Sequence, residues 1–533
     1  MSNNRRRVIL FPVFLAMATI IGIFIGRYYK NLQTNSTFYI YPRADKLTNI
    51  LNLIEREYVD PVLKNELVEE AIPKILQGLD PHSQYIPKSE LQNVNEPLEG
   101  NFSGIGIQFN MLNDTLVVIS VIANGPSEKA GVLAGDRIII VDKDTVAGVS
   151  MQSDSIVKKL RGPKGTDVNI FVHRKNVPEL IPFDITRDNI PLYSIDVGYM
   201  VSGKTGFIKI NKFSRTTFEE FTEAFNNLHR QGMKKLIIDL RNNGGGYMVT
   251  AVNIADQFLP GNELIVYTQG NAKGREEYRS NPGGYATDIK LAILIDEGTA
   301  SASEILAGAI QDNDRGVIIG RRSFGKGLVQ EQREFQDGSA IRLTIARYYT
   351  PTGRSIQKPY DHGLEDYYND LNTRYFNGEF QYKDSIRFTD TVKYVTPKGK
   401  ILFGGGGIMP DIFVPFDTAG VTDYLIQVRN KGLIYKFALD YADLNRAKLE
   451  KLQSAKDYVK YLTARNILNQ FVDYAATEGV KPDQEEIAVS EKILENHLCA
   501  YIARNIIDNK GFYPIIQDID NALQKAIGEL SGK

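Results

Sequence analysis

The sequence predicts a multidomain α/β protein, on three observations. Its 533 residues exceed what one ordinary core contains, since domains usually have about 100 to 200 residues. From Thr205 onward, strand and helix candidates alternate, which is typical of a largely parallel sheet covered by helices. A run of short strands precedes this region and a tail of helical periodicity follows it, so we expect several domains in series.

Composition excludes several classes of function. Lys and Arg number 63 and Asp and Glu number 64, so no net charge favours nucleic acid, and we expect no nucleic-acid partner. The single cysteine, Cys499, cannot form an intramolecular disulfide and supplies too few thiols for a zinc cluster. Redox chemistry and a structural metal are therefore disfavoured.

The amino terminus has the pattern of a membrane anchor. Three arginines, Arg5 to Arg7, precede an uncharged, mostly apolar run from Val8 to Gly26, close to the ~20 residues that span a bilayer. A cleaved signal peptide has a shorter apolar run, and a buried core helix rarely begins beside a basic chain terminus. We predict that residues 1–30 form a cytoplasmic stub and an uncleaved transmembrane anchor, with the rest of the chain outside the cytoplasm.

The next two segments differ in periodicity. Residues 43–98 carry apolar residues at helical spacing and are predicted to form a small helical segment. Residues 99–188 are predicted to form a compact domain, mostly of strands, with two helices. The strands expected there are Gly104–Phe109, Leu116–Val121, Asp136–Val141 and Val168–His173, and the helices are Pro126–Ala130 and Asp154–Leu160.

An α/β core is predicted for residues 189–416. Its expected strands are Gly206–Ile210, Lys235–Leu240, Leu264–Thr268, Leu291–Ile295 and Ile341–Tyr349, and its expected helices are Thr217–Gln231, Val249–Phe258 and Ser303–Gln311. Residues 417–533 repeat apolar residues at helical spacing, so we expect a separate helical domain there.

Ser301 is a candidate nucleophile. It lies in a turn between a predicted strand and a predicted helix, beside a helix amino terminus whose unpaired amides stabilise an oxyanion. Serine is also a preferred helix cap, so the alternative is that Ser301 or Ser303 only caps the helix.

Lys326 is a candidate general base. A serine hydroxyl needs a base to become a nucleophile, and the small or apolar neighbours of Lys326 would lower its pKa by burying it. An ordinary surface lysine is the alternative, because lysine is rarely buried. Gln330, four residues later, would share a face with Lys326 and could orient its amine.

A glycine run, Gly244 to Gly246, follows the predicted strand that ends at Leu240. Such a run lets backbone N–H groups approach a reacting carbonyl, as an oxyanion hole requires. A phosphate-binding loop is the competing interpretation, although no Lys-Ser/Thr pair follows the glycines directly.

Taken together, these motifs closely resemble those of the carboxy-terminal processing (tail-specific) proteases. The segments are TASASEILAGAIQD, SFGKGLVQ, DLRNNGGG, YYTPTGRSIQ and GIMPDIFVP, and the similarity runs over residues 45–416. By this resemblance Ser301 is the nucleophile, Lys326 is the general base, and Gln330 positions the lysine.

The resemblance also suggests the remaining groups of the site. The amides of Ala302 and of Gly245 or Gly246 would form the oxyanion hole. Ser303 is the rival nucleophile, disfavoured because the family motif places the reactive serine first. Glu304 falls in the matching motif, but in the first helical turn we interpret it only as favouring the helix dipole.

The same resemblance identifies residues 99–188 as a PDZ domain. Its carboxylate-binding loop would be Ser103, Gly104, Ile105, Gly106 and Ile107. Successive backbone amides there would hold a peptide carboxyl terminus while the peptide adds a strand to the sheet. Arg161, just after the second helix, is expected to link the PDZ domain to the protease.

We therefore expect a serine endopeptidase that recognises free carboxyl termini of protein or peptide substrates and cleaves through an acyl-enzyme. This Ser/Lys mechanism requires neither a metal nor another cofactor. We expect it to be a single-pass protein of the bacterial inner membrane, with its catalytic part on the periplasmic side. The alternatives are a membrane-tethered PDZ scaffold with an inactive protease core, and acyl transfer on the same architecture. The helical tail would pack on the core, self-associate or bind an adaptor.

Overall fold

The structure, a computed structural model, describes residues 15–25, 46–122, 124–175, 177–387 and 390–532. The described residues divide at Gly78 into two compact units. The second unit holds the strand-rich domain, the α/β core and the helical tail.

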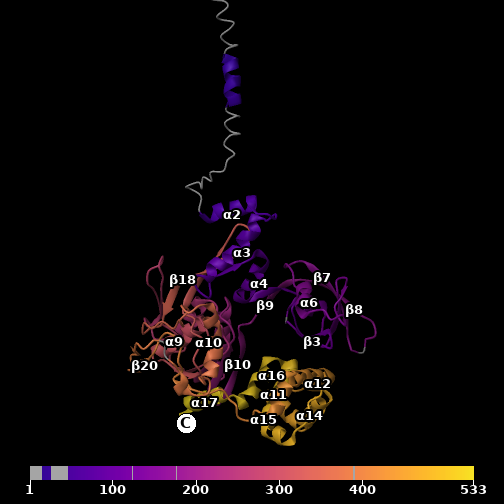
Figure 1. Ribbon diagram of the computed structural model, residues 1–533. Helices are drawn as coiled ribbons and strands as arrows, with labels where there is room; N and C mark the ends of the chain where they lie inside the picture. The colour runs from indigo at the N-terminus through magenta and orange to yellow at the C-terminus, as the bar shows by residue number, and fades with distance from the viewer. Residues whose placement is uncertain (1–14, 26–45, 123, 176, 388–389, 533) are drawn as a thin grey trace, which may run out of the picture. The chain divides into compact units, whose positions relative to one another are not determined.

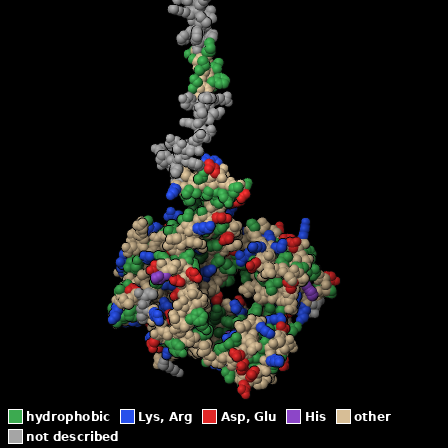
Figure 2. Space-filling view, viewed as in Figure 1, with side chains coloured by type: hydrophobic (Ala, Val, Ile, Leu, Met, Phe, Trp, Pro, Cys, Tyr) green, Lys and Arg blue, Asp and Glu red, His purple; other side chains and the backbone are tan. Residues whose placement is uncertain are grey.

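The described part of the amino-terminal unit is helical. Residues 15–25 form a helix with exposed, mostly hydrophobic side chains (Figure 2). In the part of the chain that the structure describes, no helix is both long and apolar enough to cross a membrane. Much of the predicted anchor, residues 1–30, lies outside the described residues, so the anchor stays a prediction. Two further helices follow, α2 (Lys46–Glu57) and α3 (Lys64–Gln77).

The second unit begins with β1 (Gln84–Ile86) and α4 (Lys88–Glu99), which lead into the strand-rich domain. Its antiparallel sheet has the order β3-β4-β5-β7-β8, with β6 paired to β5. The elements are β3 (Ile107–Leu112), β4 (Thr115–Val121), α5 (Pro126–Ala130), β5 (Arg137–Val141), β6 (Asp144–Thr145), α6 (Ser153–Leu160), β7 (Asp167–His173) and β8 (Ile181–Thr186). Fully buried residues such as Leu116, Ile138 and Ile156 form its core.

The predicted strand Gly104–Phe109 is divided in the structure. β2 (Asn101–Gly104) pairs with β9 (Asp188–Pro191), outside the main sheet, whereas β3 begins at Ile107. Gly106 causes the break, because its φ of +78° is incompatible with an extended strand. A Cβ at this position would lie 3.0 Å from Ile190 Cδ1, so the chain turns here in close contact with β9.

The α/β core is built on a sheet of order β10-β11-β12-β15-β16-β21, parallel from β11 onward, and alternate residues face opposite sides of it. Ile208, Ile238 and Ile293 pack on one face against α7, α8 and α9. The elements are β10 (Ile195–Ser202), β11 (Thr205–Ile210), α7 (Thr217–Arg230), β12 (Lys235–Asp239), α8 (Met248–Asp256), β15 (Lys290–Ile295), α9 (Ala302–Asp312), β16 (Val317–Gly320) and β21 (Ile412–Phe413).

A second sheet lies against this core, with the order β1-β18-β13-β14 and with β17 paired to β18. Its strands are β13 (Leu264–Gln269), β14 (Glu276–Arg279), β17 (Leu328–Glu334) and β18 (Ala340–Tyr349). β1 joins it although the whole strand-rich domain separates the two in the sequence. After β18 come α10 (Leu364–Phe376), which the sequence analysis did not predict, and the short pair β19 (Tyr394–Val395) and β20 (Ile401–Leu402).

The helical tail has a core of its own but does not fold apart from the α/β core along its whole length. Its first helices are α11 (Asp423–Asn430), α12 (Leu433–Leu449), α13 (Ala455–Thr463), α14 (Ile467–Thr477), α15 (Gln484–Ile507) and α16 (Asn509–Ile516). The last helix, α17 (Asn521–Ser531), instead lies against the α/β core (Figure 1). Its Leu523 and Ala526 pack with Ile237 and Leu294 on the second face of the core sheet. Nothing in its local sequence separates α17 from the other tail helices.

Candidate active site

Ser301 stands at the end of the turn between β15 and α9. Asp296, directly after β15, accepts hydrogen bonds from the amides of Asn242 (2.8 Å) and Gly298 (3.0 Å), which ties this turn to the glycine loop after β12. Ser301 has φ 58° and ψ −117°, and such a conformation costs a residue with a side chain about 1–3 kcal/mol. Backbone strain of this kind gathers at functional sites, and here it presents Ser301 to a cleft.

Two of the predicted groups are already engaged by Asn243. Ser303, the rival nucleophile, is fully buried and donates to the carbonyl oxygen of Asn243 (2.9 Å), so it is out of a substrate's reach. The amide of Gly245 donates to Asn243 Oδ1 (2.9 Å). Gly245 therefore supports the loop, and its own N–H is not free for an oxyanion.

The amides of Gly246 and Ala302 remain as the pair for an oxyanion hole. Neither has a hydrogen-bond partner among the described residues. A Cβ on Gly245 would lie 2.9 Å from the amide nitrogen of Ala302, so the glycine loop and the start of α9 are in contact. Gly246 has φ 145°, and a Cβ there would lie 2.0 Å from the carbonyl oxygen of Phe213, so only glycine fits.

Lys326 lies on the loop that precedes β17, and its Nζ donates to Gln330 Oε1 at 3.0 Å. Burial lowers the pKa of Lys326, and the positive charge of Arg342 lowers it further. The carboxylates of Asp80 and Glu304 act in the opposite direction but do not cancel this shift. The amine therefore loses its proton at a lower pH than an ordinary lysine does.

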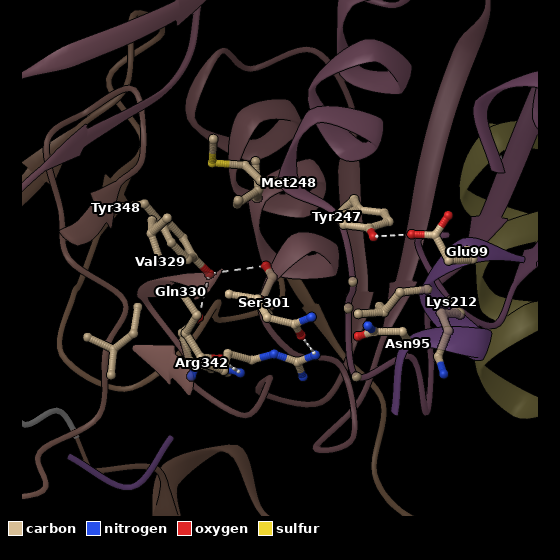
Figure 3. Close-up of a pocket in the computed structure, with 18 of the residues that line it drawn as sticks. Asn95, Glu99, Lys212, Tyr247, Met248, Ser301, Val329, Gln330, Arg342 and Tyr348 are labelled. Carbon is tan, nitrogen blue, oxygen red and sulfur yellow. Dashed lines mark hydrogen bonds between the residues drawn. The ribbon is translucent and has the colours of Figure 1, made fainter. Parts of the chain in front are cut away.

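Ser301, Lys326 and Gln330 line one cleft of about 520 Å³. Figure 3 shows Ser301 and Gln330 among the side chains that line it. The Tyr348 hydroxyl contacts the carbonyl oxygens of both Ser301 (3.1 Å) and Lys326 (2.6 Å), which holds the serine turn and the lysine loop in a fixed relation. Apolar side chains, among them Met248, complete the wall beside Ser301. The cleft therefore combines a serine, a lysine of lowered pKa and free backbone amides.

Glu304 has a larger role than the helix-dipole interpretation gave it. Its side chain is completely buried and accepts hydrogen bonds from four groups. The donors are the amides of Ser301 (2.8 Å), Gly325 (2.8 Å) and Lys326 (2.9 Å) and the hydroxyl of Ser323 (2.5 Å). Burial raises the pKa of Glu304 to about 7, although these hydrogen bonds lower it. The Ser-x-x-Glu spacing of a capping box was the one sequence signal for this contact.

His82 is a second group that the sequence analysis missed. Its carbonyl oxygen accepts a hydrogen bond from Gln330 Nε2, which leaves Gln330 Oε1 facing Lys326. A neutral Lys326 amine that donates an N–H to Gln330 Oε1 keeps its nitrogen lone pair free for another partner. If the Gln330 amide were reversed, its N–H group would donate to that lone pair and occupy it. The His82 carbonyl therefore sets which end of Gln330 meets the lysine.

Two tyrosines of α10 hold this carbonyl in place. Tyr367 Oη lies 2.7 Å from His82 Nε2, and Tyr368 Oη donates to the carbonyl oxygen of Pro81 at 2.6 Å. Burial, with the positive charge of Lys326, lowers the pKa of His82 to about 4, so the ring is neutral at neutral pH. The turn before β1 is thus part of the candidate site.

We expect Tyr367→Phe to lower kcat for peptide hydrolysis about tenfold with little change in KM. The substitution removes one part-buried hydrogen bond that fixes His82, worth up to about 1.5 kcal/mol, and Gln330 would then orient Lys326 less well. Steady-state kinetics against Tyr375→Phe, an exposed tyrosine of the same helix, measures this. An equal loss in both variants would contradict a specific role for Tyr367.

The residues predicted for peptide binding lie where the strand-rich domain meets α4. Ser103 and Gly104 belong to β2, Ile105 is buried in the domain core, Gly106 forms the turn, and Ile107 begins β3. α6 buries Ile156 and Leu160 in the same core.

Arg161 follows α6 directly and contacts two residues outside it. Its guanidinium pairs with Glu96 of α4 at 2.9 Å and lies 4.4 Å from the ring centre of Phe102. α4 also supplies Asn95 and Glu99 to the cleft around Ser301. One helix therefore contacts both Arg161 and the candidate active site.

Three protein families match this chain. Peptidase family S41 matches residues 204–366, the PDZ domain family matches residues 103–183, and a family of unknown function matches residues 424–508. A carboxy-terminal-processing protease of Bartonella bacilliformis is 35% identical over 359 residues, which are 66% of this chain and 80% of that protein. The chain belongs to the carboxy-terminal-processing protease family.

As a member of this family, the protein is a serine-type peptidase, which confirms the prediction made from its motifs. A probable CtpA-like serine protease of Staphylococcus aureus is 34% identical over 314 residues, covering 58% of this chain and 62% of that protein. The solved PDZ domain of the carboxy-terminal protease of Vibrio cholerae, in complex with peptide, is 33% identical. The match covers 17% of this chain and 99% of the chain of the solved PDZ domain, with a TM-score of 0.16.

Proposed function

We propose that the protein is a membrane-anchored endopeptidase that cleaves by a Ser301/Lys326 dyad and selects substrates by their carboxyl termini. One observation carries the catalytic part of this proposal. Lys326, a half-buried lysine of lowered pKa, is held by Gln330 in the same cleft as Ser301, which a strained turn presents. No histidine is needed as a base in this arrangement.

In the proposed mechanism, neutral Lys326 takes the proton of the Ser301 hydroxyl as its oxygen attacks the scissile carbonyl. The amides of Ala302 and Gly246 then donate to the oxyanion of the tetrahedral intermediate. The protonated lysine returns its proton to the leaving amine, and an acyl-enzyme forms on Ser301. A water molecule, deprotonated by the same lysine, hydrolyses this ester and frees the serine.

Substrate selection would begin at the PDZ domain. The loop Ser103 to Ile107 supplies successive backbone amides for a terminal carboxylate, and β3 offers an edge that an extended peptide can join. Arg161 and α4 connect this domain with the catalytic cleft, so tail binding and cleavage would be coupled there. The substrates would be proteins or peptides with free carboxyl termini.

The anchor is proposed from the basic residues Arg5 to Arg7 and the apolar run Val8–Gly26. They would place a single span in the bacterial inner membrane, with the catalytic part on its outer side. We expect the full chain in the membrane fraction of cells and a chain without residues 1–30 in the soluble fraction. Recovery of both in the soluble fraction would contradict the anchor.

The test of the dyad and of tail recognition uses the purified full chain with Ser301→Ala and Lys326→Ala variants. A loosely folded protein with a free or an amidated carboxyl terminus is digested, and mass spectrometry follows the products. We expect cleavage to stop in both variants and to slow for the amidated substrate. Unchanged cleavage by Ser301→Ala would refute the nucleophile, and equal rates for the two substrates would refute selection by the carboxyl terminus.

A further inference from the structure

Arg342 faces the catalytic cleft without a carboxylate partner. It lies on β18 directly across from Gln332 of β17, and its guanidinium donates to Gln332 Oε1 at 2.8 Å. Figure 3 shows Arg342 among the side chains that line the cleft. Within the described residues no Asp or Glu oxygen lies within 4.0 Å of it. Burial lowers the pKa of Arg342, since no nearby carboxylate stabilises its charge.

Several half-buried or buried arginines of the α/β core are paired with acids, whereas Arg315 is held by backbone carbonyl oxygens instead. Arg354 contacts Asp312 at 2.7 Å, Arg322 contacts Glu379 at 2.7 Å, and Arg241 contacts Asp239 at 2.7 Å. Burying a cation without an anion costs free energy, so such a group is more often kept for a ligand than for stability. Arg342 differs from these paired arginines in lacking an anion.

The other charges of the cleft do not neutralise Arg342. Glu99 is held by Arg215 (2.9 Å) and by the hydroxyl of Tyr247 (3.1 Å). Glu334 lines the cleft but is exposed to solvent. Lys212, whose pKa burial also lowers, adds a second cation to the wall. The cleft beside Ser301 is therefore short of negative charge.

The position of Arg342 along β17 relates it to a bound peptide. Among the described residues β17 pairs only with β18, and Gln330 and Gln332 both line the cleft. An extended peptide that lies along β17 advances about 3.3 Å per residue, and its side chains alternate in direction. Arg342 lies across from Gln332, which is two residues after Gln330 on β17. A substrate side chain beside Arg342 is thus about two residues from the substrate side chain beside Gln330, and Gln330 is the residue that holds Lys326.

We infer that Arg342, with Lys212, forms a subsite for an acidic side chain of the substrate close to the scissile bond. The inference rests on the proposed function, since it concerns the substrate of the same cleft. A planar guanidinium binds a carboxylate by donating two parallel hydrogen bonds to its oxygens. The side-chain partner of the Arg342 guanidinium is the neutral Gln332, which accepts from Nη2. The protease would then read two features of its substrate, a free carboxyl terminus and an Asp or Glu side chain near the cut.

The test measures binding first, so that it does not depend on catalysis. Amidated peptides that carry Glu, Gln or Lys at each of the four positions on either side of the cut are titrated by fluorescence anisotropy into the full chain with Ser301→Ala. We expect Glu to bind about tenfold more tightly than Gln at one position. Adding Arg342→Gln should remove this preference, and Arg342→Glu should transfer it to Lys.

Arg333→Gln is the matched control, because Arg333 lies on β17 and its side chain is 71% exposed outside the cleft. This variant should keep the tenfold preference for Glu. Equal binding of Glu and Gln peptides at every position would overturn the inference, as would a preference that survives in Arg342→Gln. If the chain with Ser301 intact does not hydrolyse peptides, the proposed function is refuted but the subsite is not. The reason is that peptide binding is measured in a separate experiment, on the Ser301→Ala chain.

Discussion

Replacing Lys326 with methionine is expected to abolish peptide hydrolysis and yet to stabilise the folded protein. Methionine has similar length but no basic nitrogen, and a general base contributes about 10²- to 10⁴-fold to the rate. We therefore expect kcat/KM to fall at least about a thousandfold. Gln330 lines the cleft, so water can replace the amine as the donor to its Oε1.

The gain in stability follows from the lowered pKa of Lys326. A lysine whose pKa is lower in the folded protein than in the unfolded chain destabilises the fold wherever the unfolded chain is protonated, below its ordinary pKa of 10.5. Methionine removes this cost at neutral pH, and we expect a higher Tm. The cost of the lysine should shrink as the pH approaches 10.5, so the difference in Tm should shrink too.

Thermal unfolding at several pH values and hydrolysis assays check both parts. Lys273→Met, at a lysine whose side chain is 61% exposed, should change neither property. A Lys326→Met protein that still cleaves peptides would exclude the lysine as the base. A lower Tm for Lys326→Met would contradict the burial argument.

Glu304→Gln is expected to lower kcat about a hundredfold and to destabilise the fold. The carboxylate accepts four hydrogen bonds, two on each oxygen, whereas a glutamine amide has one acceptor oxygen. Its N–H groups would face either Ser323 and Gly325 or Ser301 and Lys326, which are donors themselves. Each buried donor left unsatisfied costs about 1–3 kcal/mol. The serine turn and the lysine loop would then separate, which misplaces the base.

This substitution also changes the pH dependence. The pKa of Glu304 is raised from 4.5 to about 7, so the folded protein binds this proton more tightly than the unfolded chain does. The stability that this proton contributes is complete below pH 4.5 and is lost as the pH rises to about 7. Hydrolysis needs the ionised Glu304 carboxylate, which accepts all four hydrogen bonds, so the rate should fall as the pH drops through about 7. This fall adds to the loss of rate that occurs when Lys326 gains a proton and can no longer act as a base.

Urea unfolding and kcat profiles from pH 5 to 9 test this prediction, with Glu219→Gln as the control. Glu219 is also in the first turn of a helix, but its side chain is exposed. If Glu304 acted only on the helix dipole, both variants would lose a similar small amount of activity. In Glu304→Gln the fall of unfolding free energy between pH 4.5 and about 7 should be absent.

Local patterns predicted much of this fold because the core strands and helices carry their own periodicity. The placement of Ser301 between β15 and α9 could be expected from such patterns. β10, β16, α10 and β17, the strand that carries Gln330, are among the elements that escaped prediction. β10 is a half-exposed edge strand, and α10 is rich in Tyr, Asn and Asp, which are weak helix formers.

The missing parts of the site depend on contacts between distant segments. The His82 carbonyl meets Gln330 across 248 positions of sequence, and only the fold brings them together. The engagement of Gly245 by Asn243, which leaves Gly246 and Ala302 as the free amides, depends on one side-chain rotamer. Neither fact has a signature in residue type or spacing.

The glycine loop is also tied to the far end of the chain. Arg241, which precedes the glycines, pairs with Asp239 and with Asp520, and Asp520 caps α17 by accepting the amide of Leu523 (3.1 Å). A ribosome adds residues from the amino terminus, so Arg241 can form its ion pair with Asp520 only after a further 279 residues have been made. Until Asp520 has been made, the glycine loop would lack this ion pair and would be held less firmly.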